Sequence, residues 1–478
     1  MKSKQHVLRM CMAVIIVAGL ISAAHSQNFS VSYQFPQDGT EGYDPLTMNM
    51  IQATDGNLYG TTASGGVGNV DCSNYVNCGG TIFQMTPSGG FTSLYTFCSS
   101  TGCPDGRTPQ GGIIQASDGN FYGMNYAGGA YNDGTIFRLT PKGKLTTLHS
   151  FCNSPNSCSP NDGSGPNGQL IQANDGDLYG ITQGNSLFKI TLQGRFTLLY
   201  TFPNGTNPQG TLLQLANGML YGVTSGGGAH AEGEVFASTL DGKVTTLYSF
   251  CAQQGCTDGA QPLAGLALGP DGNLYGATYV GGTDGYGTVF KITPKGKFTQ
   301  LHQFTGFQNG GHDGGNPSAP MVLGSDGNLY GTAQNYGGGG YGGAGAVYQV
   351  AKGKYANVYG LPGQLCELAH PLGGLIQSTN GTFYGSDNGT CLIDFTIGLG
   401  SFVSPIPTFG KDATKVIIQG TDLTGATEVA FNGIAAKFKI LSATEITTTV
   451  PKGATTGKVK VTTPGGVLVS NVPFVVNK

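Results

Sequence analysis

The chain contains no tryptophan, and charged residues make up only 10% of its 478 positions. This scarcity argues against long, charged surface helices and favours short strands joined by tight turns. No segment after the N-terminus has 18 consecutive apolar residues, so we expect no membrane span in the mature chain. Acidic residues outnumber basic ones by 26 to 23, which argues against nucleic acid and anionic membranes as partners.

Residues 1–26 have the layout of a secretory signal peptide. Basic residues precede an apolar run from Met10 to Ile21, and Ala24-His25-Ser26 provides small residues for cleavage before Gln27. Removing this segment takes three basic residues and leaves 20 against 26, a net charge of about −6. We therefore expect a protein that is secreted to the extracellular space or the cell surface, with the periplasm as the alternative.

Glycine supplies 82 residues, and many of them belong to seven copies of one short phrase. Each copy is a turn followed by Leu or Phe and then Tyr-Gly, as in DGNLYG at Asp55 to Gly60. The tyrosines are 42 to 63 residues apart, a period typical of propellers and solenoids. They are Tyr59, Tyr122, Tyr179, Tyr221, Tyr275, Tyr330 and Tyr384.

Each repeat contains four strand-like runs. In the fifth repeat they are Leu263 to Leu268, Asn273 to Thr278, Thr288 to Thr293 and Phe298 to Phe304. Asp-Gly and Pro-Lys-Gly turns join the runs as hairpins, because glycine accepts a positive φ without a Cβ clash. Four antiparallel strands per repeat predict an all-β fold with a seven-bladed β-propeller over residues 27–396.

The two ends of the array predict how the ring closes. The last repeat has no fourth strand after Thr396, whereas Phe29 to Phe35 (FSVSYQF) matches the fourth-strand pattern and precedes the first complete repeat. The simplest inference is that this N-terminal strand completes the seventh blade and removes its exposed edge. The alternative is that Gly400 to Ser404 supplies the missing strand.

Strand alternation sorts the loops onto two faces of the propeller. Short turns of similar length, such as Pro270 to Gly272 and Pro294 to Gly296, share one face, which we name the uniform face. Long and varied loops within and between blades, such as Thr61 to Gly80 and Cys98 to Gly111, share the opposite face, which we name the variable face. Varied loops usually carry function, so a binding site is expected on the variable face.

Ten cysteines remain after removal of the signal peptide, and they fall into neighbouring pairs on the variable face. An even number of cysteines in an exported chain indicates disulfides. Metal binding is the alternative, although the spacing is not CxxC and no histidine pair accompanies it. The expected pairs are Cys72 with Cys78, Cys98 with Cys103, Cys152 with Cys158, Cys251 with Cys256, and Cys366 with Cys391.

The loops between blades share an Asp-Gly pair followed by proline or a small residue. Carboxylates at equivalent positions around a ring could coordinate cations or bind sugar hydroxyls, or they could accept N–H bonds within their own turns, which we favour. The candidate binding residues are Asp38, Asp105, Asp162, Asp258 and Asp313. His149 and His302 take the tyrosine position of the fourth strand, so we interpret both as structural. No metal site and no cofactor is expected.

A linker over residues 397–407 leads to a segment, residues 408–478, with alternating strands and turns at the spacing of a small β-sandwich. The runs from Gly420 to Gly433 (GTDLTGATEVAFNG) and from Val450 to Gly466 (VPKGATTGKVKVTTPGG) resemble an IPT/TIG domain, an immunoglobulin-like module. In bacterial exported proteins the resemblance implies a spacer, an adhesion module or a glycan-associated domain.

The repeats resemble the Gloeobacter/Verrucomicrobia (GloVer) tandem repeat family. The carrying motifs are LIQASDGNLYGTT, GTIFxxTPxGxxTTLYSF and the DGxxP loop, found across residues 29–396. The resemblance implies an exported protein, and members often end in a sorting signal. This chain finishes at Lys478 with neither an apolar tail nor a basic anchor, so membrane anchoring is not expected. The resemblance transfers no catalytic residue.

Three functions fit these features. We favour a monomeric, secreted or cell-surface protein that binds an extracellular polysaccharide or a cell-surface protein through its disulfide-stiffened variable face, without catalysis. A secreted propeller enzyme, a lyase or a glycoside-active protein, would need a convergent acid/base set on that face. Groups available for that purpose are His230, His312, His370, Glu232 and Glu234, which form no recognisable motif. The third function is a purely structural envelope protein.

Overall fold

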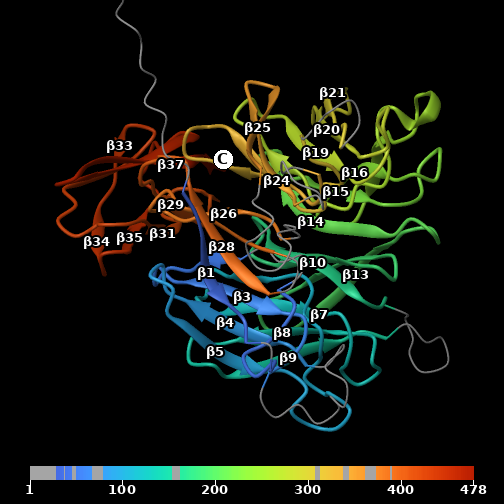
Figure 1. The fold of residues 1–478 in the computed structure, drawn as a ribbon. Helices are drawn as coiled ribbons and strands as arrows, with labels where there is room; N and C mark the ends of the chain where they lie inside the picture. Colours follow the sequence, from blue (N-terminus) through green and yellow to red (C-terminus); the bar gives the residue numbers. More distant parts are fainter. Residues whose placement is uncertain are drawn as a thin grey trace, which may run out of the picture.

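The computed structural model describes residues 28–36, 38–45, 50–66, 79–152, 162–306, 313–336, 344–360, 373–387 and 390–477. These residues form strands and one turn of 3₁₀ helix, η1 (Gln254–Cys256), without an α-helix. No helix long and apolar enough to cross a membrane is found within them. Seven four-stranded sheets are arranged as the blades of a propeller, and a smaller β-domain lies beside them (Figure 1).

Six blades are built from four strands in chain order. Blade 1 contains β2 (Ile51–Gln52), β3 (Leu58–Thr62), β4 (Thr81–Met85) and β5 (Phe91–Thr96). Blade 2 contains β6 (Ile113–Gln115), β7 (Phe121–Asn125), β8 (Thr135–Leu139) and β9 (Leu145–Ser150). Blade 3 contains β10 (Pro166–Gln172), β11 (Leu178–Thr182), β12 (Ser186–Ile190) and β13 (Phe196–Thr201).

The next three blades repeat this order. Blade 4 contains β14 (Pro208–Gln214), β15 (Leu220–Thr224), β16 (Glu234–Ser238) and β17 (Val244–Ser249). Blade 5 contains β18 (Ala267–Leu268), β19 (Leu274–Thr278), β20 (Thr288–Ile292) and β21 (Phe298–Gln303). Blade 6 contains β22 (Val322–Leu323), β23 (Leu329–Ala333), β24 (Ala346–Ala351) and β25 (Lys354–Gly360).

The seventh blade combines the two ends of the array. It contains β26 (Ile376–Gln377), β27 (Phe383–Ser386), β28 (Cys391–Thr396) and, as its outer strand, β1 (Asn28–Gln34). The strand β1 runs antiparallel to β28, with Phe29 opposite Phe395. The ring of Tyr33 in β1 stacks on Phe91 of blade 1, with centroids 4.0 Å apart. The N-terminal strand therefore joins the last blade to the first.

The repeated phrase DGxLYG has a structural explanation in the first hairpins of five blades. In blade 1, the Tyr59 hydroxyl donates to Asp55 Oδ2 (2.7 Å), and the backbone amide of Asn57 donates to Asp55 Oδ1 (3.0 Å). A Cβ on Gly60 would lie 2.5 Å from the Phe83 ring, so glycine leaves room for the aromatic residue of the third strand. The same Tyr–Asp bond recurs for Tyr122, Tyr179, Tyr275 and Tyr330, with Asp118, Asp175, Asp271 and Asp326.

The hydrophobic core lies mainly between neighbouring blades. Between blades 4 and 5, for example, Val235 and Phe250 pack in one buried cluster with Leu274 and Phe290. Burying a large apolar side chain contributes roughly 1.5–3 kcal/mol. Each blade therefore depends on its neighbours for stability, as in other repeat proteins.

A glutamine at the end of the first strand joins neighbouring blades at the uniform face. Gln377 Oε1 of blade 7 accepts a hydrogen bond from Ser325 N of blade 6 (2.7 Å), and its Nε2 donates to Gly381 O of its own hairpin (3.1 Å). Blades 5 and 6 have Leu268 and Leu323 in this position. The glutamines that repeat the bridge to the preceding blade are Gln52, Gln115, Gln172 and Gln214.

The C-terminal domain is a sandwich of two sheets. One sheet has the order β29 (Ser404–Ile406), β31 (Lys415–Gln419), β35 (Glu445–Thr449) and β34 (Phe438–Ile440). The other has the order β30 (Phe409–Gly410), β37 (Gly466–Val476), β36 (Gly457–Thr463), β32 (Glu428–Phe431) and β33 (Ile434–Ala435). Val416, Ile418, Phe431, Val459 and Phe474 belong to its buried core. Because β29 pairs with β31, Ser404 and its neighbours belong to this sandwich.

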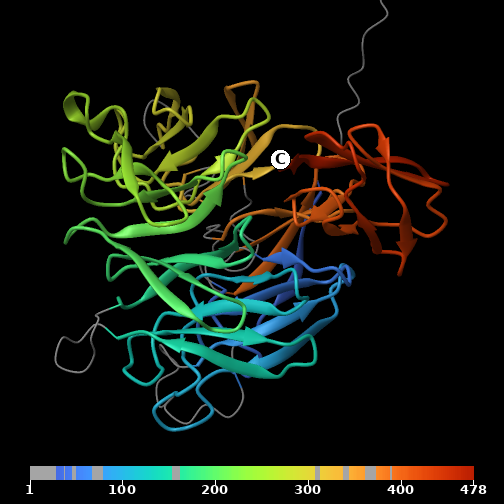
Figure 2. The ribbon, with the colours of Figure 1, turned by 180° about the vertical axis from the view of Figure 1, so that it is seen from behind.

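The sandwich lies against one side of the ring (Figure 2). Gln419 Nε2, in a buried side chain, donates to Ala53 O of blade 1. Asn471 Nδ2 donates to Leu323 O of blade 6 (3.2 Å). The Thr421 hydroxyl lies 2.8 Å from that of Thr379 in blade 7. These contacts are at first-hairpin turns, so the C-terminal domain docks on the uniform face.

Candidate binding face

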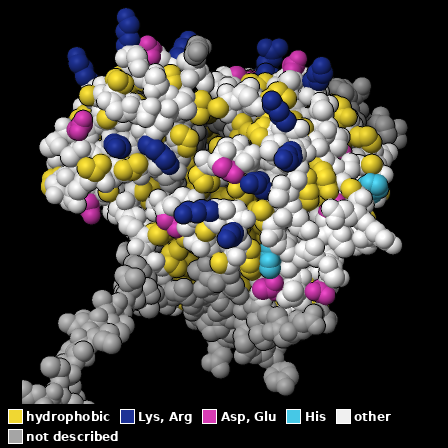
Figure 3. Space-filling model, turned by 90° about the horizontal axis from the view of Figure 1, so that it is seen from above, with side chains coloured by type: hydrophobic (Ala, Val, Ile, Leu, Met, Phe, Trp, Pro, Cys, Tyr) yellow, Lys and Arg dark blue, Asp and Glu magenta, His cyan; other side chains and the backbone are white. Residues whose placement is uncertain are grey.

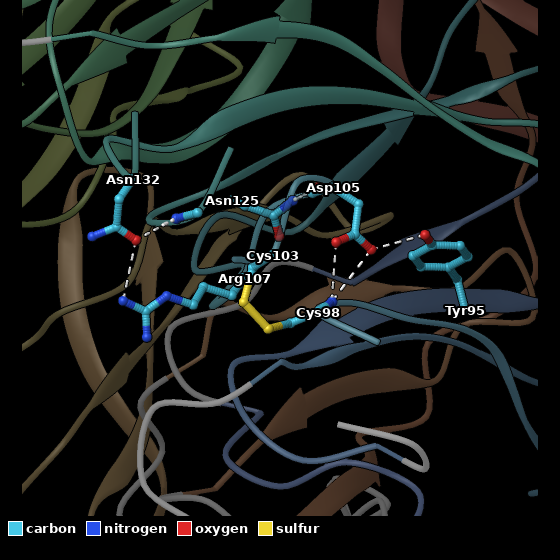
Figure 4. The surroundings of a disulfide bond; sticks show 8 residues. Tyr95, Cys98, Cys103, Asp105, Arg107, Asn125 and Asn132 are labelled. Atoms are coloured by element: carbon cyan, nitrogen blue, oxygen red, sulfur yellow. Dashed lines mark hydrogen bonds between the residues drawn. A yellow bond between two sulfur atoms is a disulfide. The ribbon is translucent and has the colours of Figure 1, made fainter. Parts of the chain in front are cut away.

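The loops between blades on the variable face fold back on an acidic side chain. Asp105 accepts hydrogen bonds from the Tyr95 hydroxyl (2.9 Å) and from Cys98 N (3.2 Å) (Figure 4). Asp258 accepts from the Tyr248 hydroxyl (2.7 Å) and from a loop backbone amide (3.0 Å). These carboxylates tie each loop to the fourth strand that precedes it. Asp258 is completely buried, so it could contact a ligand only if its loop opened.

Two blades place histidine where the others have tyrosine. His149 Nε2 lies 2.7 Å from Asp162 Oδ2, and its ring stacks on Phe196 with centroids 3.9 Å apart. His302 Nε2 lies 2.8 Å from Asp313 Oδ2. Burial by itself would raise the pKa of Asp313, but hydrogen bonds from His302 and from its own loop outweigh burial and hold that pKa below its ordinary value. The contacts of both histidines are therefore those of strand–loop supports.

The acidic position of the first loop between blades is occupied by Glu41. Glu41 accepts a hydrogen bond from the Tyr33 hydroxyl, as Asp105 does from Tyr95. Asp38 is exposed and accepts from the backbone amide of Thr40 (3.0 Å). The sequence pattern that marks this acidic position is an acidic residue, then glycine, two further residues and proline. Residues 41–45 (EGYDP) keep this spacing, whereas the Asp-Gly pair at Asp38 lacks the proline.

The residue before this proline has a left-handed backbone in six loops. The six are Asp44 (φ 57°), Thr108 (57°), Gly165 (57°), Asn207 (47°), Gln261 (52°) and Asn316 (54°). For the β-branched Thr108 this conformation is unusual and carries strain. Hydrogen bonds hold it in place: Thr108 N donates to Gly79 O of blade 1 (2.8 Å), and Tyr126 N donates to Thr108 O (3.0 Å). A propeller has a central channel between its blades, and we name its variable-face end the mouth of the channel. The mouth is thus built from loops bonded across blades.

Disulfides close two of these loops. Cys98 is bonded to Cys103 and Cys251 to Cys256, which confirms two predicted pairs. Cys152 and Cys391 are also disulfide-bonded. The other four predicted cysteines, Cys72, Cys78, Cys158 and Cys366, lie outside the described residues. A loop as short as five residues gains about 2 kcal/mol from such a bond in the chain-entropy account.

A cavity of about 390 Å³ lies where the first strands of several blades begin, at the variable-face end of the central channel. One wall comes from blades 2, 3 and 4 and carries amide side chains. They are Gln110, Asn167, Gln169, Gln183 and Gln209. The other wall comes mainly from blades 5, 6 and 1 and carries small or aliphatic residues. They are Ala63, Leu263, Ala264 and Pro320.

Glycines let the backbones of the inner strands meet beside this cavity. A Cβ on Gly111 would lie 1.7 Å from Gly168 O, and a Cβ on Gly168 would lie 2.0 Å from Gly210 O. Only glycine permits this approach. Sequence reasoning missed the cavity, although a signal was present: an amide residue and then glycine follow the loop proline in three successive blades, at Gln110, Asn167 and Gln209.

The groups considered for catalysis do not converge among the described residues. His230 is exposed, and Glu232 is half-buried on the same loop. Glu234 is buried at the start of β16, and burial raises its pKa. His312 and His370 lie outside the described residues. No cluster of three potential metal ligands is found in the described part of the chain.

Comparison with known proteins agrees with the fold. No curated protein sequence matches the chain. A streptogramin B lyase structure aligns with a TM-score of 0.51 at 17% identity, covering 78% of this chain and 99% of that one. Virginiamycin B lyase from Staphylococcus aureus aligns with a TM-score of 0.51 at 15% identity, covering 77% and 99%. At these identities the likeness shows the propeller fold alone.

Matches to two protein families cover most of the chain. The Gloeobacter/Verrucomicrobia repeat matches at residues 18–186, 80–268 and 183–391, and the IPT/TIG domain matches at residues 401–476. Both resemblances inferred from the sequence are thereby confirmed. The chain belongs to the Gloeobacter/Verrucomicrobia repeat family and carries a C-terminal IPT/TIG domain.

Proposed function

We propose that this protein is an exported binding or adhesion protein that holds an extracellular glycan or protein at the variable face, without catalysis. The observation that carries the proposal is the cavity at the mouth of the channel. It lies among loops fixed by carboxylates, disulfides and bonds between blades, and preorganised loops lose less entropy on binding. The described lining has no side chain that titrates near neutral pH, so acid/base catalysis would need other groups.

The disulfides and the acidic loop residues both fit this proposal. The disulfides support an oxidising compartment. The contacts of Asp105, Asp162, Asp258 and Asp313 support a role in holding the binding loops, while the exposed Asp38 is the acidic candidate most open to direct contact.

A screen against polysaccharides and cell-surface proteins tests the proposal. The mature protein is compared with Leu263→Trp, which fills the cavity mouth, and with Lys295→Trp, which adds the same ring to a uniform-face turn. We expect Leu263→Trp to bind at least about tenfold more weakly and Lys295→Trp to bind normally. Equal losses in the two variants, or the lack of a ligand in both classes, would count against the proposal.

A further inference from the structure

The cavity has two chemically different walls, and from them we propose that it binds the end of a neutral saccharide. This inference rests on the proposed function and names the ligand class for the same site. A pyranose ring has hydroxyl groups around its edge and C–H groups on its faces. The amide wall of blades 2–4 suits the hydroxyl edge, and the aliphatic wall of blades 5, 6 and 1 suits a C–H face.

In the amide wall, neighbouring side chains donate hydrogen bonds to the oxygens of two glutamines. The amide NH₂ groups of these glutamines are then left to donate to a ligand. Asn167 Nδ2 donates to Gln209 Oε1 (2.7 Å), and the Tyr126 hydroxyl donates to Gln183 Oε1 (3.1 Å). These bonds occupy the glutamine oxygens, while the Nε2 groups of Gln183 and Gln209 have no partner among the described residues. These Nε2 groups can donate hydrogen bonds to the oxygens of neighbouring sugar hydroxyls.

A second observation at the same site is an unsatisfied hydroxyl. Ser318 lines the cavity, and its Oγ is buried without a hydrogen-bond partner among the described residues. Buried polar groups without partners are rare in folded proteins because each loses its hydrogen bonds to water. A rotation of the Ser318 side chain about χ1 would bring this hydroxyl into the cavity, where a ligand hydroxyl would supply the missing partner.

The lining also selects by charge. No Asp, Glu, Lys, Arg or His belongs to the described lining. A buried carboxylate, sulfate or phosphate on a ligand would therefore lack a counter-charge, which is costly. The volume of about 390 Å³ falls at the small end of ligand sites, which suits a chain end better than a long segment. The cavity therefore favours uncharged sugars over uronates.

Calorimetric titration of the mature, full-length protein tests this inference. The probes are short oligosaccharides of glucan, mannan and galactan, with oligogalacturonate as the acidic counterpart. We expect binding of a neutral probe, weakened about fivefold by Ser318→Ala and about tenfold by Gln183→Leu, as loss of one hydrogen bond implies. The melting temperature of Ser318→Ala should equal or exceed that of the parent, because the substitution removes an unsatisfied hydroxyl. Ser88→Ala, on a uniform-face turn, is the matched control and should bind normally.

Other outcomes separate this inference from the proposed function. Neutral binding that neither variant weakens, or binding of oligogalacturonate alone, would overturn the saccharide assignment and leave a variable-face binding protein. If no saccharide binds and the screen finds a protein ligand, the saccharide assignment is also overturned, and the proposed binding function remains. A ligand held equally well by Leu263→Trp would overturn both.

Discussion

Single side chains hold the blades of this ring together. The Gln377 bridge between blades 6 and 7 satisfies a backbone amide of one blade and a carbonyl of the other, and its side chain is only 5% exposed. Leu268 and Leu323 show that the position also accepts an apolar residue of similar size. The glutamine therefore adds hydrogen bonds to a contact that packing already provides.

Replacing Gln377 by leucine should destabilise the protein by about 1–3 kcal/mol, because Ser325 N and Gly381 O would lose their buried partner. Gln172→Leu removes the same bridge between blades 2 and 3 at a more exposed position, so we expect a smaller loss. Urea unfolding of both variants measures the difference. A larger effect at Gln172 would contradict the role of burial.

Glu234 should make stability depend on pH. Burial raises its pKa above the ordinary value of 4.5, so the unfolded chain ionises first and the folded state carries the cost of a buried charge at pH 7. We expect Glu234→Gln to be more stable than the parent at pH 7. The advantage should shrink as pH falls through the folded pKa and vanish below about 4.5. Unfolding measured at pH 7 and pH 4 checks the sign, and an advantage that grows towards low pH would refute it.

At the level of elements, β1 closes the ring. It supplies the outer strand of blade 7 and packs Tyr33 against Phe91 of blade 1. Without it, β28 would present an unpaired edge, and such edges template association between chains.

Deleting residues 28–35 should therefore lower the melting temperature and produce self-association. Differential scanning calorimetry and light scattering measure the two effects, with a chain that begins at Gln27 as the control. A deletion variant that melts at the control temperature and stays monomeric would show that β1 is not needed for closure.

Much of the strand pattern was predictable, because each blade repeats local chemistry: Asp-Gly turns, a Tyr-Gly pair and alternating aromatic strands. The acidic loop position was harder to assign. An Asp-Gly pair marks Asp38, yet Glu41 makes the equivalent bond, since the fixed distance to the proline at position 45 sets the loop geometry. The spacing carried more information than the residue type.

On the scale of the whole molecule, the sequence marks the cavity only in part. An amide residue and glycine follow the loop proline in three successive blades, but the close approach of Gly111, Gly168 and Gly210 is a tertiary property. The place of the C-terminal domain is also a tertiary property, set by contacts such as Gln419 with Ala53. Because this domain docks on the uniform face, those contacts leave the variable face available to a ligand.

The side of the molecule that is seen from above in Figure 3 carries few charged side chains. Its acidic and basic side chains are scattered singly over it. Such a surface offers no large field of one sign to attract a charged partner. Selectivity would then come from the shape and hydrogen bonds of the cavity.

Hydrogen exchange with and without a bound neutral oligosaccharide tests the central claim most directly. The account predicts slower exchange in residues 107–112, 164–169 and 207–211, where the loops and first strands of blades 2–4 form the mouth of the cavity. It predicts unchanged exchange in uniform-face turns such as residues 294–297. Protection confined to those turns or to the C-terminal domain, with the cavity mouth unaffected, would contradict the account.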